Sequence, residues 1–503
     1  MSEPAVLALD QGTTGSTALV VARSGRVLSR AYSEFTQHFP RPGWVEHDAA
    51  EIRDVTFRVA REALSSPAAR SASVEALGIT NQRETLVVWD RETLEPVHRA
   101  IVWQDRRTTE ICRELREAGH EEEIRRRTGL VLDPYFTGTK LTWLLRERPE
   151  LRARAEAGEL AAGTIDAWLI ASLTGGAHRT DATNASRTLL YDLDSGDWSP
   201  RLLELLEVPA ALLPEVRASG GDFGTSTGGG LGVELPILGV AGDQQAALYG
   251  QGCWEQGLAK NTYGTGAFLL LHTGGERVHS PSGLLTTVAC DARGGPAFAM
   301  EGAIFVAGAA VQWLRDAVGI LDTAAQSEPL ARGLEGNDGV YFVPAFVGLG
   351  APWWQAEARG MITGLTRGTG REHLVRAALE AMAYQTADVA EAMQADSGVP
   401  LAELRVDGGA TENGWLMEFQ AGILGVPVHR AAIVETTAFG AAGLAGVTGG
   451  VWKDPLEFLN ARTPATVFEP AMSEARRREL RRGWTRAVRA ALAWTLDEGG
   501  EEG

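Results

Sequence analysis

The chain opens on an apolar strand that runs into a turn of glycine and threonine, Val6-Leu7-Ala8-Leu9-Asp10-Gln11-Gly12-Thr13-Thr14-Gly15. A second apolar run, Ala18–Ala22, follows, and a turn at Ser24-Gly25 leads to a third strand. Short apolar runs separated by tight turns predict a β-meander. A helical pattern then covers residues 49–65, and strands alternate with helices as far as residues 237–245. This order predicts an α/β fold whose polar strand ends bind a ligand.

From about residue 251 the second half of the chain repeats this pattern. The strand-like segment Leu258–Thr262 leads into the turn Tyr263-Gly264-Thr265-Gly266 and then into the apolar run Phe268–Leu271. A third turn of small residues, Asp407-Gly408-Gly409, precedes a helix-like segment, residues 413–424. Because one style of turn recurs in both halves, we predict an approximate duplication with a ligand held between the copies.

Length and composition agree with this prediction and exclude several functions. A chain of 503 residues predicts two domains, 1–250 and 251–503. Three widely spaced cysteines without a Cys-x-x-Cys pair argue against a disulfide-stapled scaffold. The net charge of −18 makes nucleic acid a poor partner. Because there is neither a basic leader nor an apolar run of roughly 18 residues, we expect no membrane span and a cytoplasmic location.

Two conspicuous motifs have simple structural explanations. Gly224-Thr225-Ser226-Thr227-Gly228 matches the Gly-x-Ser-x-Gly motif of hydrolases, but it lies in a glycine-rich run, residues 220–232, without the strand that a nucleophile elbow needs. We interpret this run as a flexible surface loop. Seven arginines lie in residues 476–489, where apolar residues recur at every fourth position, namely Leu480, Trp484, Val488 and Leu492. This spacing predicts an amphipathic terminal helix rather than an RNA-binding segment.

The turns of glycine and threonine have the composition of a triphosphate site. Inward-pointing backbone N–H groups require glycine, and threonine hydroxyls add donors for phosphate oxygens. One such turn lies at residues 12–14 and another at residues 264–266. Asp10 ends the first strand, where a carboxylate can hold the Mg²⁺ that offsets phosphate charge. Since no lysine lies in a Walker A motif, the sequence predicts a nucleotide bound between two domains of another fold.

Five longer segments carry a family resemblance, and they occur in the order found in that family. The segments are Gly78–Thr85, Trp103–Arg106, Tyr135–Leu144, Gly242–Gln245 and Gly360–Glu380. With them the chain resembles the FGGY carbohydrate kinases over essentially its whole length, and in particular the members that phosphorylate glycerol. The resemblance implies an α/β fold of two actin-like, ribonuclease H-like ATPase domains with a ligand cleft between them.

The resemblance also implies a glycerol site. Its polar residues are Arg83, Glu84, Tyr135, Asp243 and Gln244, and its apolar walls are Trp103 and Phe268. A forked donor beside a carboxylate suits the hydroxyl groups of a triol. Because neighbouring strand side chains point to opposite faces, Arg83 and Glu84 meet one ligand only if their strand ends there. The alternative is an ordinary ion pair between adjacent residues.

Asp243 is the catalytic residue in this interpretation. An alcohol that attacks a γ-phosphate must lose its proton, and a carboxylate at a strand end inside the cleft accepts it. The alternative is that Asp243 caps the helix that follows, because Asp is well suited to a helix N-cap. One residue can serve both purposes, and the resemblance favours catalysis.

The nucleotide site implied by the resemblance draws on both halves of the chain. Its residues are Thr13, Thr14, Gly264, Thr265, Gly308, Gln312, Gly409 and Asn413, with Asp10 for the metal ion. Gly308 and Gln312 belong to a predicted helical run, residues 304–314. One position departs from the family, because Thr17 stands where relatives usually carry an arginine. The lost positive charge puts the affinity for nucleotide in doubt, but it leaves the class of reaction unchanged.

The resemblance implies transfer of phosphate from ATP to glycerol with Mg²⁺, giving sn-glycerol 3-phosphate and ADP. It also implies a cytoplasmic homo-oligomer, a dimer or tetramer. One alternative is a kinase of the same family that acts on a ketose or a sugar acid, although a pocket walled by Trp103, Tyr135 and Phe268 suits three carbons better than five or six. The other is a non-catalytic actin-like nucleotide-binding protein, against which stand the intact Asp10, Arg83, Glu84 and Asp243.

A regulatory loop of the family is altered in this chain. Some members are inhibited by fructose 1,6-bisphosphate through a loop of the form Gly-Gly-x-Gly-Gly-Thr-Arg, and others are activated by phosphorylation of a histidine nearby. Here the loop reads Gly228-Gly229-Gly230-Leu231-Gly232-Val233-Glu234, and residues 216–236 contain no histidine. Since Glu234 repels a sugar phosphate, we predict that both controls are absent and that the loop is a plain surface connection.

Overall fold

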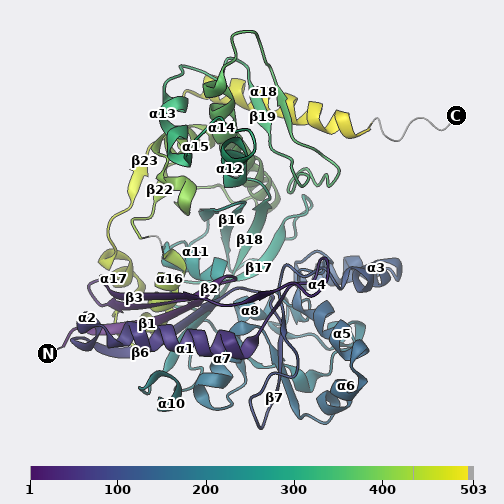
Figure 1. Cartoon of the computed structure of the whole chain (residues 1–503), viewed down its shortest axis with the longest axis vertical. Coiled ribbons are helices and arrows are strands. Elements are labelled where there is room, and N and C mark those ends of the chain that lie inside the picture. The colour runs from purple at the N-terminus through teal and green to yellow at the C-terminus, as the bar shows by residue number, and fades with distance from the viewer. Residues whose placement is uncertain (1, 434, 497–503) are drawn as a thin grey trace.

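The computed structural model describes residues 2–433 and 435–496. The chain forms two bodies, one above the other in Figure 1. The first body contains a five-stranded sheet, and the second body contains a seven-stranded sheet. In the described ranges, no helix is both long enough and apolar enough to cross a membrane.

The first sheet begins with three antiparallel strands in sequence, which confirms the predicted β-meander. Two further strands join in parallel on the other side of the first strand. In sheet order the strands are β14 (Ile237–Gly242), β6 (Ser73–Asn81), β1 (Pro4–Gln11), β2 (Gly15–Ala22) and β3 (Val27–Glu34). The carboxyl ends of the parallel strands β1, β6 and β14 therefore lie at one edge of the sheet.

Helices cover both faces of this sheet. On one face α1 (Ala49–Ser65) follows the predicted bounds, and the Asp48 carboxylate caps it by accepting from the N–H groups of Ala50 and Glu51. Its apolar side packs with α7 (Ile165–Thr174). On the other face lie α11 (Asp243–Gly250) and α16 (Thr436–Thr448).

The segment between β6 and β14 forms a third apolar core at one end of the first body. Its main helices are α3 (Thr109–Glu117), α4 (Glu121–Thr128), α5 (Thr137–Glu147), α6 (Pro149–Glu156), α8 (Ala182–Ala185) and α9 (Pro200–Leu205). Its strands are β7 (Val87–Asp90), β8 (Ala100–Ile101), β9 (Leu160–Gly163), β10 (Arg179–Asp181), β11 (Tyr191–Asp192), β12 (Asp197–Trp198) and β13 (Glu215–Arg217). Elsewhere in the first body lie β4 (Gln37–His38), β5 (Glu46–His47) and α2 (Pro67–Arg70).

The second sheet repeats the plan of the first. A strand at its centre pairs antiparallel with the next strand along the chain on one side and parallel with a later strand on the other. In sheet order the strands are β17 (Leu285–Cys290), β18 (Pro296–Ile304), β16 (Ala267–Gly274), β15 (Leu258–Tyr263), β21 (Glu403–Asp407), β22 (Val428–Arg430) and β23 (Thr466–Phe468). The order β18-β16-β15-β21-β22 matches β3-β2-β1-β6-β14, as the predicted duplication requires.

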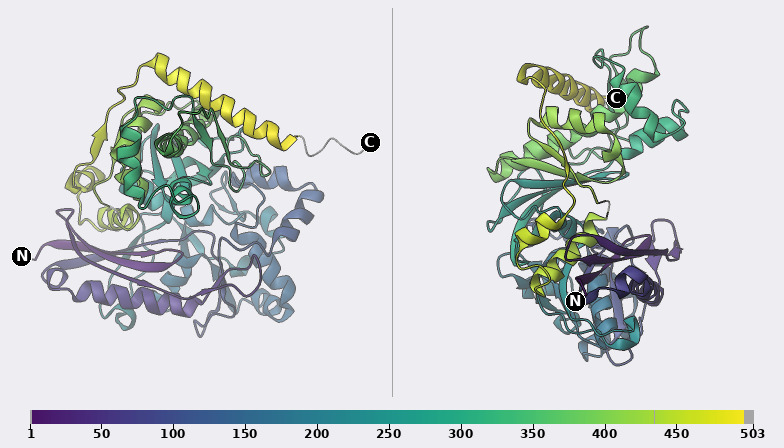
Figure 2. Two further views of the ribbon diagram at one scale, coloured as in Figure 1. Left: turned by 45° about the horizontal axis from the view of Figure 1, so that its top comes forward. Right: turned by 90° about the vertical axis from the view of Figure 1, so that its left-hand side faces the viewer.

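The second body buries the long helix α14 (Arg371–Ser397) at its centre. Around it lie α12 (Gly308–Asp316), α13 (Ser327–Arg332), α15 (Gly414–Leu424), α18 (Glu474–Leu496) and the hairpin of β19 (Tyr341–Val343) and β20 (Met361–Thr363). The apolar stripe of α18 is buried at Leu480, Trp484 and Val488, and Figure 2 shows this helix lying along the outside of the body. The prediction of a docked terminal helix is confirmed.

The last part of the chain crosses between the bodies more often than the division at residue 250 suggests. After β22 the chain returns to the first body, where α16 and α17 (Pro455–Ala461) pack on its sheet, and β23 then leads back to the second body. Glycine permits the close contact, because a Cβ on Gly440 would lie 1.8 Å from the carbonyl oxygen of Ala246 in α11. The segment 436–461 thus belongs structurally with residues 1–250.

The glycine-rich run at residues 220–232 is more ordered than a flexible loop. Gly228–Leu231 form a single helical turn, α10, whose Leu231 is buried in the apolar core that α1 and α7 form with the first sheet. Arg61 of α1 donates to the carbonyl oxygen of Gly230 at 2.6 Å. The hydroxyl of Ser226 is buried and bonds to the backbone at residues 233 and 235, which agrees with the rejection of a nucleophile elbow.

Candidate active site

A cluster of four buried charges joins the two bodies at the carboxyl ends of the first sheet. The guanidinium of Arg83, just past the end of β6, makes two bonds to Glu301 of β18, at 2.7 and 3.2 Å. Arg187 donates to Glu84 at 2.6 Å and to Glu301 at 3.1 Å. The four side chains are at most 3% exposed. Two arginines from the first body are thus neutralised by one carboxylate from each body.

The backbone explains how adjacent residues enter one cluster. Strand β6 ends at Asn81, and Glu84 has a φ of +60°, in the left-handed region. A residue other than glycine pays about 1–2 kcal/mol to adopt this conformation. The turn brings the side chains of Arg83 and Glu84 to the same side, with Arg83 Nε 3.7 Å from Glu84 Oε1. The strand therefore ends where the sequence predicted, and the pair belongs to a larger network than an isolated ion pair.

Asp243 lies beside this cluster at the first residue of α11. Its carboxylate forms an ion pair with Arg83, whose Nε lies at 3.1 Å, and accepts from the N–H of Gln244 at 2.7 Å. About a third of its side chain is exposed, whereas its neighbours in the cluster are buried. The N-cap of α11 is Gly242, so the alternative that Asp243 serves as the N-cap is wrong. Its carboxylate is the one acid in contact with Arg83 that solvent or a substrate can reach.

Two of the three predicted aromatic walls lie together. The rings of Trp103 and Tyr135 meet edge to face with centroids 5.6 Å apart. The indole N–H of Trp103 donates to the hydroxyl of Thr13 at 2.9 Å, which ties this wall to the first predicted phosphate turn. Phe268 lies across the cleft on β16. The strand register places it on the sheet face that Glu301 and Lys260 share, and this is the face that contacts Arg83.

Lys260 is a buried cation that the sequence analysis missed. It is fully buried on β15, and its ammonium donates to the side-chain oxygen of Gln244 and to the hydroxyl of Thr262. Burial lowers the pKa of Lys260 to about 8, although the nearby carboxylates of Asp407 and Asp243 oppose this shift. Gln244, predicted for glycerol, is therefore held by its oxygen, which leaves its amide N–H groups to other partners.

Arg187 and Glu301 were also missed, although a weak signal is present. Each is a charged residue in a segment that otherwise lacks charge, Asn184–Leu190 for Arg187 and Pro296–Ile304 for Glu301. A charge in a buried segment must be paired, so a partner was to be expected. The sequence gives no indication of which partner, because 218 residues separate Arg83 from Glu301.

Asp10 lies at the end of β1 among other acids. Burial, and then the carboxylates of Asp243 and Glu435, raise the pKa of Asp10 to about 7. Thr17 is its direct partner on β2, so an arginine at position 17 would lie beside this carboxylate, and threonine adds no charge there. Among the described residues, no group of three or more His, Cys, Asp or Glu side chains is arranged to hold a metal ion.

The predicted nucleotide residues of the second half line one cavity, whose volume is ≈ 510 Å³. This volume lies within the range of about 300–1,000 Å³ that is usual for ligand pockets. The residues are Gly264, Thr265, Gly308, Gln312, Gly409 and Asn413. Thr13 and Thr14 are not among its lining residues and belong to the turn between β1 and β2 in the first body. The structure therefore brings six of the eight predicted residues together and leaves two across the cleft.

Two details of this cavity differ from the prediction. The helical run expected from residue 304 begins at Gly308, because Ile304 ends strand β18 and pairs with Ala267. Gly308 packs against the first turn so closely that a Cβ would lie 2.6 Å from the carbonyl oxygen of Gly264. Asn413 also has a structural purpose, since its side chain caps α15 by accepting from the N–H of Leu416 at 2.9 Å.

The fold and this pair of sites define a kinase of two actin-like domains, and the chain belongs to the FGGY family of carbohydrate kinases. Residues 5–250 match the N-terminal domain of that family and residues 259–449 match its C-terminal domain. The family and the fold class predicted from the sequence are confirmed.

Within the family the chain is similar to glycerol kinases. It is 55% identical over 493 residues to the glycerol kinase of Deinococcus radiodurans, a match that covers 98% of each chain. It is 53% identical to glycerol kinase 2 of Thermotoga maritima, over 97% of this chain and 99% of the relative. The structure of Plasmodium falciparum glycerol kinase with ADP superposes with a TM-score of 0.94 at 34% identity, over 98% of this chain and 99% of that one.

We predict that Glu301→Gln destabilises the protein by about 3–5 kcal/mol at pH 7, because it leaves two buried arginines facing one carboxylate. Burial alone would raise the pKa of Glu301, but Arg187 and Arg83 outweigh it and lower the pKa from 4.5 to about 2. The contribution of this carboxylate is present above pH 4.5 and is lost as the pH falls toward 2. Urea titrations of both proteins at several pH values measure it.

The matched control is Glu204→Gln, which removes an exposed carboxylate that pairs with Arg201 at 2.8 Å. It should cost at most about 1 kcal/mol. A loss for Glu301→Gln as small as that of the control, or one that does not shrink toward low pH, would contradict the assignment.

Proposed function

We propose that this chain transfers the γ-phosphoryl group of ATP to glycerol and releases sn-glycerol 3-phosphate and ADP. The observation that carries the proposal is the match to glycerol kinases at 55% and 53% identity over nearly the whole chain. Two features of the cleft support it. A partly exposed carboxylate, Asp243, lies against the guanidinium of Arg83, and the second body holds a cavity lined by two small-residue turns and the start of α12.

Glycerol would lie between the charged cluster and the aromatic wall. Arg83 and Glu84 are held in place by their partners Glu301 and Arg187, so they offer fixed donors and acceptors to hydroxyl groups. The edge-to-face pair of Trp103 and Tyr135 would cover the carbon chain. Preorganised contacts of this kind select a short triol because no side chain has to move to meet it.

Asp243 would accept the proton of the attacking hydroxyl. The hydroxyl oxygen forms a bond to the γ-phosphorus, the bond from that phosphorus to the β–γ bridging oxygen breaks, and ADP leaves with the electron pair. The bond from Arg83 fixes the direction of the carboxylate. Lys260 holds the side-chain oxygen of Gln244, so that the Gln244 amide N–H groups face outward as donors to a second hydroxyl.

The nucleotide would be held by both bodies. The cavity in the second body suits the nucleoside, and the turn with Thr13 and Thr14 would reach the phosphates when the bodies close. Asp10 fits a magnesium ion, because burial and then the neighbouring carboxylates of Asp243 and Glu435 disfavour its charged form and raise its pKa, and a bound cation would offset both effects. Mg²⁺ commonly binds proteins through one or two carboxylates together with phosphate oxygens and waters, and it neutralises charge on the transferred group.

The substrate is tested by measuring ADP release with glycerol, dihydroxyacetone, xylulose and gluconate. We expect kcat/KM for glycerol to exceed that for each other compound by at least about tenfold, because longer substrates crowd a site shaped for three carbons. A preference for xylulose or gluconate would show a different carbohydrate kinase of the same family. ADP release with none of the four compounds would favour the non-catalytic alternative.

We predict that Asp243→Asn lowers kcat by about 10²–10⁴, because the amide keeps the shape of the side chain and cannot accept a proton. Glycerol binding, measured by calorimetry, should change little. The control is Asp54→Asn, which alters an acid on α1 that is 67% exposed and should leave kcat unchanged. An Asp243→Asn enzyme with wild-type turnover would exclude Asp243 as the base.

A further prediction concerns the metal site and uses stability as its measure. Since the pKa of Asp10 is raised from 3.8 to about 7, ionisation of Asp10 destabilises the folded chain increasingly from pH 4 to pH 7 and fully above it. In metal-free buffer we therefore expect Asp10→Asn to have the higher melting temperature at pH 8 and an equal one near pH 4. Mg²⁺ with ADP should stabilise the wild type more than Asp10→Asn at pH 8; equal stabilisation would contradict the assignment.

Three predictions from the sequence are kept unchanged as part of the proposal. They are assembly as a homodimer or homotetramer, a cytoplasmic location, and insensitivity to fructose 1,6-bisphosphate and to histidine phosphorylation. The glycine-rich run supports the predicted insensitivity to fructose 1,6-bisphosphate. Arg61 bonds this run to α1, and position 234 carries Glu in place of an arginine that could bind a sugar phosphate.

A further inference from the structure

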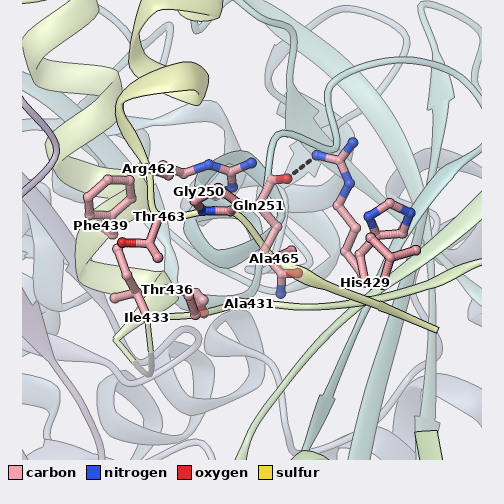
Figure 3. A pocket seen from close by; sticks show the side chains of 14 residues that line it. Gly250, Gln251, His429, Ala431, Ile433, Thr436, Phe439, Arg462, Thr463 and Ala465 are labelled. Carbon is pink, nitrogen blue, oxygen red and sulfur yellow. Dashed lines mark hydrogen bonds between the residues drawn. The ribbon is translucent and has the colours of Figure 1, made fainter. Parts of the chain in front are cut away.

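A second cavity, of ≈ 300 Å³, lies outside the proposed active site, where the chain crosses between the two bodies. Its wall includes residues from each of the three connections, which are the end of α11 at Gly250 and Gln251, the segment 431–433 before α16, and the segment 462–465 after α17. Figure 3 shows these segments around the cavity. An occupant would touch both bodies and every connection between them.

Arg462 brings a positive charge to this cavity. Its guanidinium donates to the carbonyl oxygens of Gly250, at 2.6 Å, and of Leu459, at 3.2 Å. Within the described chain it forms no ion pair with a carboxylate, so its charge is uncompensated. Burial, and then the nearby Arg405, lower the pKa of Arg462 to about 10. In Figure 3 its head group lies beside Gly250 and Gln251.

A second arginine reaches the cavity from the other body. Arg405 of β21 donates to the carbonyl oxygen of Gln251 and pairs with Glu403, to which its Nε lies at 2.6 Å. Glu403 also lies 3.2 Å from the imidazole of His429, another residue of the cavity wall. One carboxylate thus pairs with Arg405 and contacts His429, and the charge of Arg462 leaves the wall with an excess of positive charge.

Capping of α11 accounts for only part of this arrangement. Cations at a helix C-terminus satisfy its last carbonyl groups, and the arginines contact the carbonyls of Gly250 and Gln251 in this way. A guanidinium has five N–H groups, and the bonds of Arg462 use two of them. The remaining donors lie at the wall of a cavity, where an anion can accept from them.

The rest of the wall is apolar, with a few hydroxyl groups. Ile433 and Phe439 lie together on the side away from His429 in Figure 3, and Val467 adds to the lining. Thr463 provides a hydroxyl, whereas the hydroxyl of Thr436 donates to the buried carboxylate of Asp407. A cavity of ≈ 300 Å³ has more room than a bare inorganic anion needs, and its apolar side suits a small organic group.

We propose that this cavity binds a small phosphate monoester, with the phosphate between Arg462 and Arg405 and the organic group against Ile433 and Phe439. Two guanidinium groups, one from each body, match a dianion with three terminal oxygens, because charge-assisted N–H···O bonds are the strongest available. A monocarboxylate carries half the charge and binds more weakly. The site is separate from the nucleotide cavity, with which it shares no lining residue.

The test is calorimetry of the full chain with phenyl phosphate in the presence of saturating ADP and glycerol, so that the proposed active site is filled and no turnover occurs. We expect saturable binding with one site per chain, at least about tenfold weaker binding of benzoate, and weaker binding of inorganic phosphate, which lacks the apolar group. Arg462→Gln keeps a hydrogen-bond donor and removes the charge, and it should weaken phenyl phosphate binding by about tenfold or more.

Two further variants keep the result interpretable. Arg70→Gln removes an exposed arginine on α2 and should bind phenyl phosphate like the wild type. Ala465→Trp fills the cavity from an exposed position while it keeps both arginines, and it should abolish binding even if Arg462→Gln proves unstable.

The proposal would be overturned if the wild type did not bind phenyl phosphate, or if Ala465→Trp bound it equally well. It would also be overturned if phenyl phosphate bound without ADP and not with ADP, because the ligand would then belong to the nucleotide cavity. Because the measurement involves no phosphate transfer, its outcome is independent of the proposed kinase activity.

Discussion

The ion pair between Arg83 and Glu301 is the contact on which the arrangement of the cleft depends. It joins a strand end of the first body to a strand of the second, and both side chains are almost completely buried. A buried charge without a partner costs several kcal/mol, so each residue fixes the other. Arg187 and Glu84 complete the cluster because two guanidinium groups need two carboxylates. The left-handed backbone at Glu84 is tolerated because this network holds it.

The cluster also explains why neighbouring groups have unusual properties. Asp243 is a third acidic neighbour of Arg83. The ion pair orients the Asp243 carboxylate, which stays partly exposed. Asp10 has Thr17 as its partner on β2, and burial, together with the carboxylates of Asp243 and Glu435, raises its pKa. Lys260 is buried near the carboxylates of Asp407 and Asp243 and donates a hydrogen bond to Gln244. The cleft therefore combines a balanced cluster of paired charges around Arg83 with a buried acid at Asp10, an arrangement suited to placing a hydroxyl group near a polyanion and its metal ion.

The duplicated sheets set where the two ligands and the cleft can lie. The carboxyl end of β6 contacts the second body through Arg83 and Glu301, and the turns that follow β15 and β21 line the cavity of the second body. The return of α16 and α17 to the first sheet adds two crossings of the chain. Close contact at Gly440 locks α16 against α11, so motion between the bodies must be absorbed by the three connections, which also form the wall of the second cavity.

The sequence by itself determined the local features: the β-meander, the bounds of α1, the hairpin of β15 and β16, and the docked helix α18. Each rests on periodicity or turn chemistry within about 25 residues, and the family resemblance added the residues that line the nucleotide cavity. Only the tertiary structure decided which charges meet. Arg187, Glu301 and Lys260, the late start of α12 at Gly308 and the return of residues 436–461 depend on contacts between segments far apart in the chain. Such pairings obey burial and charge balance and leave no periodic signal in the sequence.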